Sequence, residues 1–202
     1  MEISVNIKQA IALSGLVAAA ACISPLALAQ DWGWYLGASG GQSDVKDFCQ
    51  NPVPVGTSCD NTGSSYTVFG GLQFNKFLGV ELGYTDISQN KASDAVTTVT
   101  WKVKGVELLG VGSLPVNQYF EVYGKVGVFF WDLDDGCTGA PCTFSSRSET
   151  GADLTYGFGA QVNFSKSVAA RAQYQRYKDV GNEATTGTSD INILSLGILF
   201  RF

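Results

Sequence analysis

The stretch NILSLGILFRF, which runs from Asn192 to Phe202, carries the pattern that decides the fold. Every second residue, counted back from the end, is apolar: Phe202, Phe200, Ile198, Leu196 and Leu194. The residues between them are smaller and more mixed, and include Arg201 and Gly197. A period of two predicts a β-strand with one apolar face. Because the termini of soluble domains are usually polar and frayed, this face indicates a solvent other than water.

The same alternation recurs along the chain and predicts eight strands. They are expected at residues 34–41, 66–74, 77–87, 98–114, 119–133, 153–164, 168–177 and 192–202. The connections after the second, fourth and sixth strands are short, and the others are long and rich in Gly, Ser, Thr, Asn and Asp. Such spacing is typical of an up-and-down antiparallel meander. An open sheet of this size would leave exposed edges, so we expect it to close into a barrel.

The two faces of these strands differ in kind. One parity is bulky and apolar, and comprises Tyr66, Val68, Leu72, Phe74, Leu78, Val80, Leu82, Tyr84, Val122, Val126, Val128, Phe130, Tyr156, Phe158, Ala160, Val162 and Phe164. The other collects Gln73, Glu81, Glu107, Lys125, Gln161, Arg171, Gln173, Gln175 and Arg201. A soluble lipocalin-like barrel would place the apolar set inside, whereas a barrel in lipid places it outside. The prediction is therefore an all-β fold, an eight-stranded antiparallel up-and-down transmembrane β-barrel.

Residues 1–29 have the features of a cleaved signal peptide. Lys8 precedes a short apolar run, and Ala27 and Ala29 fit the small-x-small pattern of a cleavage site. The alternative is a lipoprotein signal at Cys22, but Ala19 stands where such signals usually have Leu. We expect residues 30–202 to form one barrel domain, exported to the outer membrane of a Gram-negative cell.

Four cysteines follow the predicted signal peptide, namely Cys49, Cys59, Cys137 and Cys142. An even number in an exported chain predicts disulfides, and the short separations favour pairing Cys49 with Cys59 and Cys137 with Cys142. A metal site is the alternative, which the absence of any His disfavours. The net charge of −5 and the lack of a basic patch argue against nucleic-acid binding.

Four charged residues are expected inside the barrel: Glu81, Glu107, Lys125 and Arg171. Two acids and two bases in a small interior should pair, because an unpaired buried charge is costly. An eight-stranded barrel is just wide enough for side chains to fill, which favours a salt-bridged core. Without His, the usual Ser–His and Cys–His nucleophiles are absent. We predict no enzymatic activity, no cofactor and no metal site.

Five stretches, in order, resemble the transmembrane domain of the outer-membrane protein A family: FLGVELGYTD (77–86), GVELLGVGSLPV (105–116), VYGKVGVFFWDLD (122–134), FGAQVNFSKSVAARAQYQRY (158–177) and LSLGILFRF (194–202). In that family the positions matching Glu81, Lys125 and Arg171 belong to an interior ionic network that plugs the lumen and is a candidate gate. The closing Phe202 resembles the signal read by the barrel-assembly machinery. The best-known members continue into a peptidoglycan-binding domain, so wall anchoring is not carried over to a chain that stops at Phe202.

Acidic residues gather in the expected long connections: Asp44, Asp47, Asp60, Asp132, Asp134, Asp135, Glu149, Asp179, Glu183 and Asp190. They are interpreted as a solvated cap or as a surface for an extracellular ligand. The predicted function is a structural and surface-interaction role in the cell envelope, and the alternative is a narrow, gated, porin-like pore for small solutes or ions. The expected partners are outer-membrane lipid, lipopolysaccharide and the barrel-assembly machinery, around a monomer with both termini in the periplasm.

Overall fold

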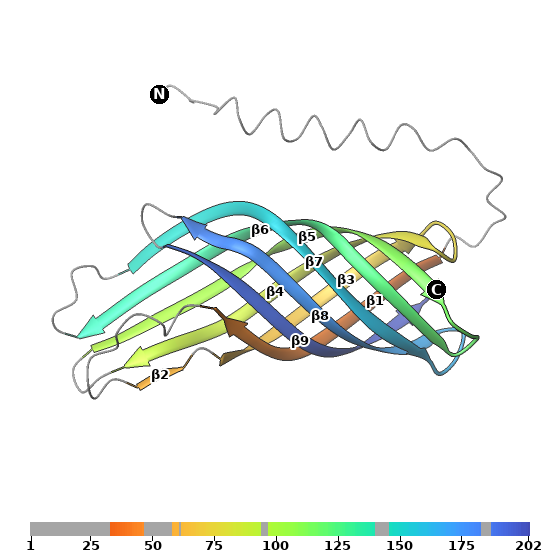
Figure 1. Cartoon of the computed structure of the whole chain (residues 1–202), viewed down its shortest axis with the longest axis horizontal. Helices are drawn as coiled ribbons and strands as arrows, with labels where there is room; N and C mark the ends of the chain where they lie inside the picture. The colour runs from red at the N-terminus through yellow and green to blue at the C-terminus, as the bar shows by residue number, and fades with distance from the viewer. Residues whose placement is uncertain (1–32, 47–57, 61, 94–96, 140–145, 183–186) are drawn as a thin grey trace, which may run out of the picture. The chain divides into compact units, whose positions relative to one another are not determined.

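The computed structural model describes residues 33–46, 58–60, 62–93, 97–139, 146–182 and 187–202, which contain nine β-strands (Figure 1). The strands are β1 (Gly33–Val45), β2 (Ser58–Asp60), β3 (Thr62–Gln73), β4 (Leu78–Ser93), β5 (Thr97–Pro115), β6 (Phe120–Gly139), β7 (Ser146–Asn163), β8 (Val168–Asn182) and β9 (Gly187–Arg201). None of the described residues belongs to a helix long and apolar enough to cross a membrane.

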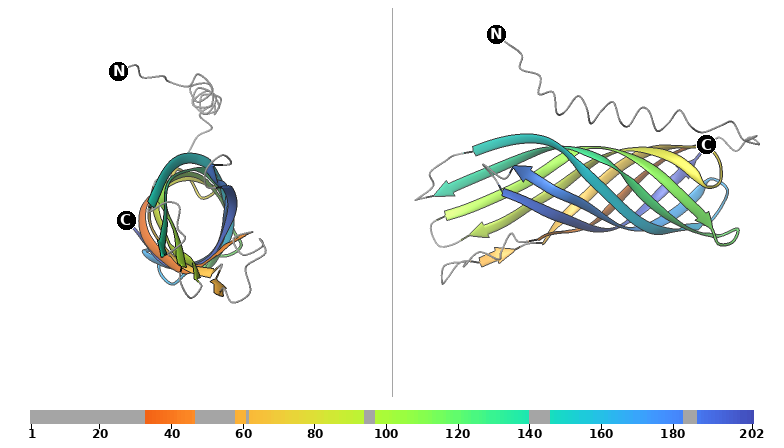
Figure 2. Two further views of the ribbon diagram at one scale, coloured as in Figure 1. Left: turned by 90° about the vertical axis from the view of Figure 1, so that its left-hand side faces the viewer. Right: turned by 45° about the horizontal axis from the view of Figure 1, so that its top comes forward.

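All the strands except β2 close into one antiparallel barrel. Each of them pairs with the next along the chain, and β9 pairs back with β1 from Tyr35↔Arg201 to Val45↔Ile191. The end-on view shows the resulting ring of strands (Figure 2). The predicted eight-stranded, antiparallel, up-and-down barrel is confirmed.

One end of the barrel, called here the turn end, carries the three short connections at residues 74–77, 116–119 and 164–167. Asn75 stabilises the first, because its Oδ1 accepts hydrogen bonds from the backbone N–H groups of Phe77 (2.7 Å) and Leu78 (2.9 Å). Asn117 and Ser165 cap the other two in the same way. Such side-chain bonds are the usual reason that Asn and Ser favour tight turns. The described chain also begins and ends here.

At the opposite end, called here the loop end, the strands run further than predicted. The sequence placed the fifth strand at 119–133, whereas β6 continues to Gly139 and pairs there with β5 and β7. The acidic residues Asp132, Asp134, Asp135 and Glu149, which were expected in a loop, therefore lie on strands. Strand β2 was not predicted, and it pairs with the extension of β4 beside it (Figure 1).

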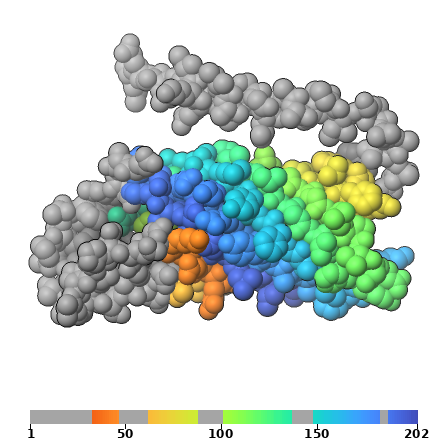
Figure 3. Space-filling view, viewed as in Figure 1, coloured from red at the N-terminus to blue at the C-terminus, as the bar shows by residue number. Residues whose placement is uncertain are grey.

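The apolar parity faces outward, as predicted. Leu82, Phe158 and Leu196 are 57%, 65% and 72% exposed although they lie in the middle of regular strands. In the space-filling view, the side chains of the described strands form a continuous outer surface on the visible face (Figure 3). An exposed apolar surface that surrounds a closed barrel is the arrangement that lipid requires.

This apolar outer surface ends at a sharp row near the loop end. Tyr84, Val106 and Phe130 lie side by side in register on β4, β5 and β6 and are outward and apolar. Two residues further toward the loop end, the same outward positions are Asp86, Lys104 and Asp132, which are also in register. The outer face therefore changes from apolar to charged between these two rows. We call the part beyond this row the projecting part of the barrel and the part below it the lipid-facing part.

The interior also changes at this level. The inward side chains of the lipid-facing part include buried Glu81, Glu107, Lys125, Gln161, Arg171, Gln173 and Gln175, as predicted. A change of the lining along the lumen was not predicted from the sequence. Toward the loop end the inward positions hold an apolar cluster, called here the apolar plug: Val45, Ile87, Trp101, Val103, Phe129, Trp131, Leu133, Tyr177, Val180, Ile191 and Ile193.

Candidate functional site: the barrel lumen

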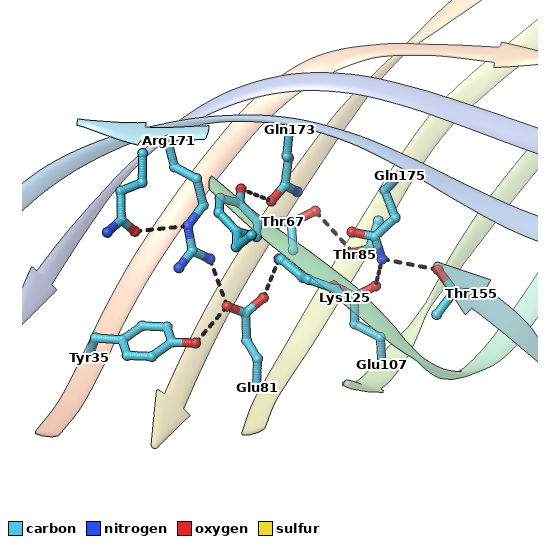
Figure 4. A network of polar contacts seen from close by, with 12 residues as sticks. Tyr35, Thr67, Glu81, Thr85, Glu107, Lys125, Thr155, Arg171, Gln173 and Gln175 are labelled. Carbon is cyan, nitrogen blue, oxygen red and sulfur yellow. Dashed lines mark hydrogen bonds and ion pairs between the residues drawn. The ribbon is translucent and has the colours of Figure 1, made fainter. Parts of the chain in front are cut away.

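The strand register brings charged side chains from separate strands to the same interior. Glu81 lies on β4, Glu107 on β5, Lys125 on β6 and Arg171 on β8, and all four point inward. The close-up shows Lys125 and Arg171 directed at the carboxylate of Glu81, with Glu107 to one side (Figure 4). The lumen therefore holds all four of these predicted site residues.

Three of the four charges meet at Glu81. Lys125 Nζ donates to Glu81 Oε1 at 2.5 Å, and Arg171 Nη1 donates to Oε2 at 2.7 Å. Tyr35 OH adds a third bond to Oε2 at 2.9 Å. These four residues, called here the ionic cluster, come from β1, β4, β6 and β8, so the cluster extends across the barrel. A buried carboxylate with two cations and a hydroxyl donor has its charge and lone pairs well compensated.

Aromatic rings surround the two cations of the ionic cluster. Arg171 Cζ lies 4.6 Å from the ring centroid of Tyr123 and 5.0 Å from that of Phe69, and Lys125 Nζ lies 5.4 Å from Phe69. The electron-rich faces of such rings attract cations, most strongly where water is excluded. The rings therefore add favourable contacts and also occupy the space beside the charges.

Glu107 does not join the ionic cluster. Its Oε2 accepts hydrogen bonds from Gln175 Nε2 (2.7 Å) and Tyr177 OH (2.9 Å), and it makes no ion pair with any residue that the structure describes. The expectation that both acids pair with bases thus fails for Glu107. Neutral donors from β8 reach it, while the ammonium of Lys125 is turned to Glu81. A Cβ at Gly83 would lie 2.8 Å from Glu107 Oε1, so this glycine leaves the room that the carboxylate occupies.

On the turn-end side of the ionic cluster, the lumen narrows to a very small space. A mouth of about 250 Å³ is lined by Gln73, Asn75, Lys76, Pro115, Glu121, Asn163 and Arg201. Further in, a cavity of about 10 Å³ lies between Arg201 and Arg171, which is scarcely the space that one water needs. Gln161 connects the ionic cluster to the mouth. Its Oε1 accepts a hydrogen bond from Arg171 Nε (3.3 Å), and its Nε2 donates one to Asn163 Oδ1 (3.0 Å).

On the loop-end side, the apolar plug fills the interior. The rings of Phe129 on β6 and Tyr177 on β8 pack at 4.5 Å between centroids, although these strands are not neighbours in the barrel. Trp131 donates from Nε1 to Asp153 Oδ2 at 2.6 Å. Tyr177 connects the two levels, since its hydroxyl bonds Glu107 and its ring packs in the plug. The plug gathers buried side chains from β1, β4, β5, β6, β8 and β9, so it occupies the lumen in this half as well.

The outer surface of the projecting part carries ion pairs. Lys104 Nζ lies 3.5 Å from Asp132 and 3.3 Å from Asp134, and Lys102 Nζ lies 3.2 Å from Asp86. Asp190 pairs with Arg176 and with Lys178, the latter at 3.6 Å. Several carboxylates that were expected to form a solvated cap are thus held by bases on the strands.

Asp190 shows the electrostatic result of this pairing. Partial burial alone would raise the pKa of its carboxyl, but the hydrogen bond from Arg176 and one from the backbone N–H of Asp179 outweigh that effect. The pKa of Asp190 therefore lies below its ordinary value of 3.8, and the group is ionised at neutral pH.

Several predicted site residues lie outside the part of the chain that the structure describes. Cys49 and Cys142 fall in segments that the structure does not describe, and the side chains of Cys59 and Cys137 are not described either. The two predicted disulfides therefore remain predictions, as do the roles of Asp47, Asp60 and Glu183. Phe202 is described, is 79% exposed at the turn end, and donates its backbone N–H to Trp34 O at 2.9 Å. Among the described residues no group of His, Cys, Asp and Glu could hold a metal ion.

The sequence interpretation missed the tyrosines of the lumen. Tyr35, Tyr123 and Tyr177 are 6%, 4% and 2% exposed, and all make hydrogen bonds in the interior. The aromatic residues that the sequence analysis assigned to a face all belong to the outward parity. Parity alone would have placed them correctly, because Tyr123 is two residues from Lys125 and Tyr177 is two residues from Gln175.

A closed barrel with an apolar outer band and a polar, ion-paired interior defines the class of outer-membrane β-barrels. The sequence model of the family described as OmpA-like transmembrane domain matches residues 29–202. Outer membrane protein A of Escherichia coli O157:H7 is 28% identical over 198 residues, and that of Serratia marcescens is 31% identical over 207 residues. Each alignment covers 96% of this chain, and the chain spans about half the length of these relatives, 55% and 56% respectively. The chain belongs to the OmpA-like transmembrane domain family and is located in the Gram-negative outer membrane.

Two solved structures support the fold. Neisserial surface protein A has a TM-score of 0.63 at 15% identity, covering 84% of this chain and 97% of that one. Ail, the attachment invasion locus protein of Yersinia pestis, has a TM-score of 0.57 at 18% identity, covering 86% of this chain and 100% of that one. Ail has also been crystallised with the heparin analogue sucrose octasulfate. At these identities the likeness is one of fold alone.

Proposed function

We propose that the protein is a structural and surface-interaction barrel, which spans the outer membrane and presents its loop end to the outside of the cell. The observation that carries this proposal is the filled lumen. Side chains meet across it in the ionic cluster, the apolar plug gathers buried side chains from six strands, and the space beside Arg171 is about 10 Å³. The alternative, a narrow gated pore, would need a continuous path that these contacts interrupt.

The projecting part is the proposed interaction surface. It continues the barrel wall beyond the apolar band and carries the charged pairs of Lys102, Lys104 and Asp190 on its outside. Function often resides on loops and edges that a rigid scaffold holds in place. The row next to the apolar band, Asp86, Lys104 and Asp132, lies at the level that we propose for the headgroups of lipopolysaccharide. We further propose that the protein works as a monomer without enzymatic activity and that Phe202 serves in recognition by the barrel-assembly machinery.

Conductance across planar bilayers tests the proposed function. The purified, folded barrel is expected to leave the bilayer at its background conductance, because two levels of side chains close the lumen. Regular channel steps from the wild-type protein would contradict the structural role and favour the pore. Folding is checked first by the shift in gel mobility between unheated and heated samples.

Labelling of whole cells tests the proposed orientation. If the loop end lies outside, a membrane-impermeant thiol reagent should reach at least one of Cys49, Cys59, Cys137 and Cys142 after reduction. A Cys-to-Ser variant of all four is the matched control for background labelling. Failure to label any of the four in intact cells, together with labelling after the outer membrane is opened, would reverse the orientation.

A further inference from the structure

The apolar plug lies at a different height in the barrel from the ionic cluster. On β6, Lys125 belongs to the ionic cluster, Phe129 begins the plug, and Leu133 lies near its far end. Phe129 lies four steps further along the strand than Lys125, which is roughly 13 Å. Any path through the lumen would therefore meet the two groups one after the other.

The two levels close the lumen by different physics. The ionic cluster is held by charge and hydrogen bonds, so a rearrangement of its salt bridges changes it. The plug contains no ion pair, and its members Val103, Phe129 and Ile191 are fully buried. An apolar constriction excludes ions because the water that would solvate them is itself excluded. Salt-bridge exchange at Glu81 leaves this second barrier in place.

Access to the ionic cluster differs between the two ends. From the turn end, the polar mouth around Glu121 and Arg201 leads toward Arg171. From the loop end, the apolar plug stands between the outside and the charges. Tyr177 is the junction, with its hydroxyl on Glu107 and its ring against Phe129.

We infer that the apolar plug is a second seal in series with the ionic cluster, so that opening the cluster alone yields no conducting path and aqueous solutes approach the cluster from the turn end only. This inference rests on the proposed function, because it explains why a barrel with a rearrangeable ionic core stays closed. It assigns the closure to uncharged residues that lie from the level of Phe129 toward the loop end.

Conductance of three variants separates the two seals. The first variant, Arg171→Ala, removes one cation of the ionic cluster. The second, Phe129→Ala with Trp131→Ala, removes two aromatic side chains of the plug. The third combines all three changes. Each of the first two is expected to leave the bilayer at background, and the combined variant is expected to give discrete conductance steps. Equal steps from Arg171→Ala alone and from the combined variant would overturn the inference. A folded combined variant without any steps would overturn it too, because the closure would then lie elsewhere.

A second measurement needs no opened variant. In a background with the native cysteines replaced by Ser, a small water-soluble thiol reagent is applied to Gln73→Cys, at the turn-end mouth, and to Ile193→Cys, within the plug. Modification of the first and protection of the second are expected in the folded barrel, and modification of Ile193→Cys at a similar rate would contradict the seal. Wild-type conductance would instead refute the proposed function, so the two failures are distinguishable.

Discussion

The lipid-facing part and the projecting part of the barrel have opposite patterns, although the same strands build both. On β6, Lys125 points inward and Val126 outward in the lipid-facing part. Beyond the row that ends at Phe130, Leu133 points inward, with 1% exposure, and Asp134 points outward. On β6 the strand pairing is the same in both parts, because one ladder with β5 runs through them without a break.

The solvent outside explains the inversion. Lipid accepts apolar side chains at no cost, so the lipid-facing part can place its polar residues inside and satisfy them with one another. In water the burial of apolar surface lowers the free energy, so the projecting part is organised like a small soluble domain. One strand can therefore follow two burial patterns, and the row at which its outward residues change from apolar to charged marks the edge of the membrane.

The largest effect is expected from removing the hub of the ionic cluster. Glu81→Ala leaves Lys125 and Arg171 buried without their anion, and such uncompensated charges typically cost about 3–5 kcal/mol. The free energy of unfolding in lipid vesicles, measured with urea, is the test. Glu107→Gln is the matched control, since Glu107 is bonded by neutral donors, and it should cost much less. Equal losses for the two variants would show that the ionic cluster has no special role.

A buried leucine of the projecting part is expected to behave as in a soluble core. Leu133→Ala removes a side chain with 1% exposure, and such truncations cost about 2–5 kcal/mol. Val126→Ala on the same strand, which is 56% exposed on the lipid side, should change the free energy of unfolding little, because lipid fills the space. If Val126→Ala cost as much as Leu133→Ala, the contrast between the two parts would be lost.

A charge placed on the lipid side of the barrel is expected to destabilise it. Leu82 and Glu81 are adjacent and point to opposite faces. Leu82→Arg places a guanidinium in hydrocarbon and should cost about 2–4 kcal/mol near the midplane. Folding yield and unfolding free energy in vesicles measure it, with Leu82→Ala as the control for lost side-chain volume. Insertion of Leu82→Arg as complete and as stable as the parent would mean that this face does not meet lipid.

The smallest effect concerns pH and the outer ion pairs. The pKa of Asp190 is lowered, so its pairing stabilises the folded state above the ordinary value of 3.8 and loses that contribution as the pH falls below it. Because the pair is near the surface, at most about 1 kcal/mol is expected. Asp190→Asn should remove this part of the acid dependence of the free energy of unfolding. An unchanged acid dependence would show that the pair contributes nothing.

The sequence was sufficient for the strand order, the short turns and the orientation of the lipid-facing part. Period-two patterns such as that of residues 192–202 are strong there, because bulky apolar residues alternate with small or polar ones. The projecting ends of the strands other than β5 were predicted too short, since their outward polar residues resemble those of a loop. For β5 the predicted strand at 98–114 included this end, because in TWKVKG, residues 100–105, Trp101 and Val103 share the parity of Glu107.

The site was predicted less completely than the fold. Parity placed Glu81, Glu107, Lys125 and Arg171 inside, but the partners of each charge depend on side-chain reach across the barrel, which no local pattern encodes. Two acids and two bases suggested two pairs, whereas three charges converge and Glu107 relies on Gln175 and Tyr177. Knowledge of the three-dimensional register was needed to separate the two levels of closure.

The central claim is that the outer face of β4, β5 and β6 passes from lipid into water at one row while the inner face stays buried. A nitroxide scan along β6 tests it most directly, with labels placed singly at positions 126, 130, 132 and 134 in a cysteine-free background. Collisions with oxygen, which concentrates in lipid, should dominate at Val126 and Phe130, and collisions with a water-soluble nickel complex should dominate at Asp132 and Asp134. A single environment at all four positions would contradict the account.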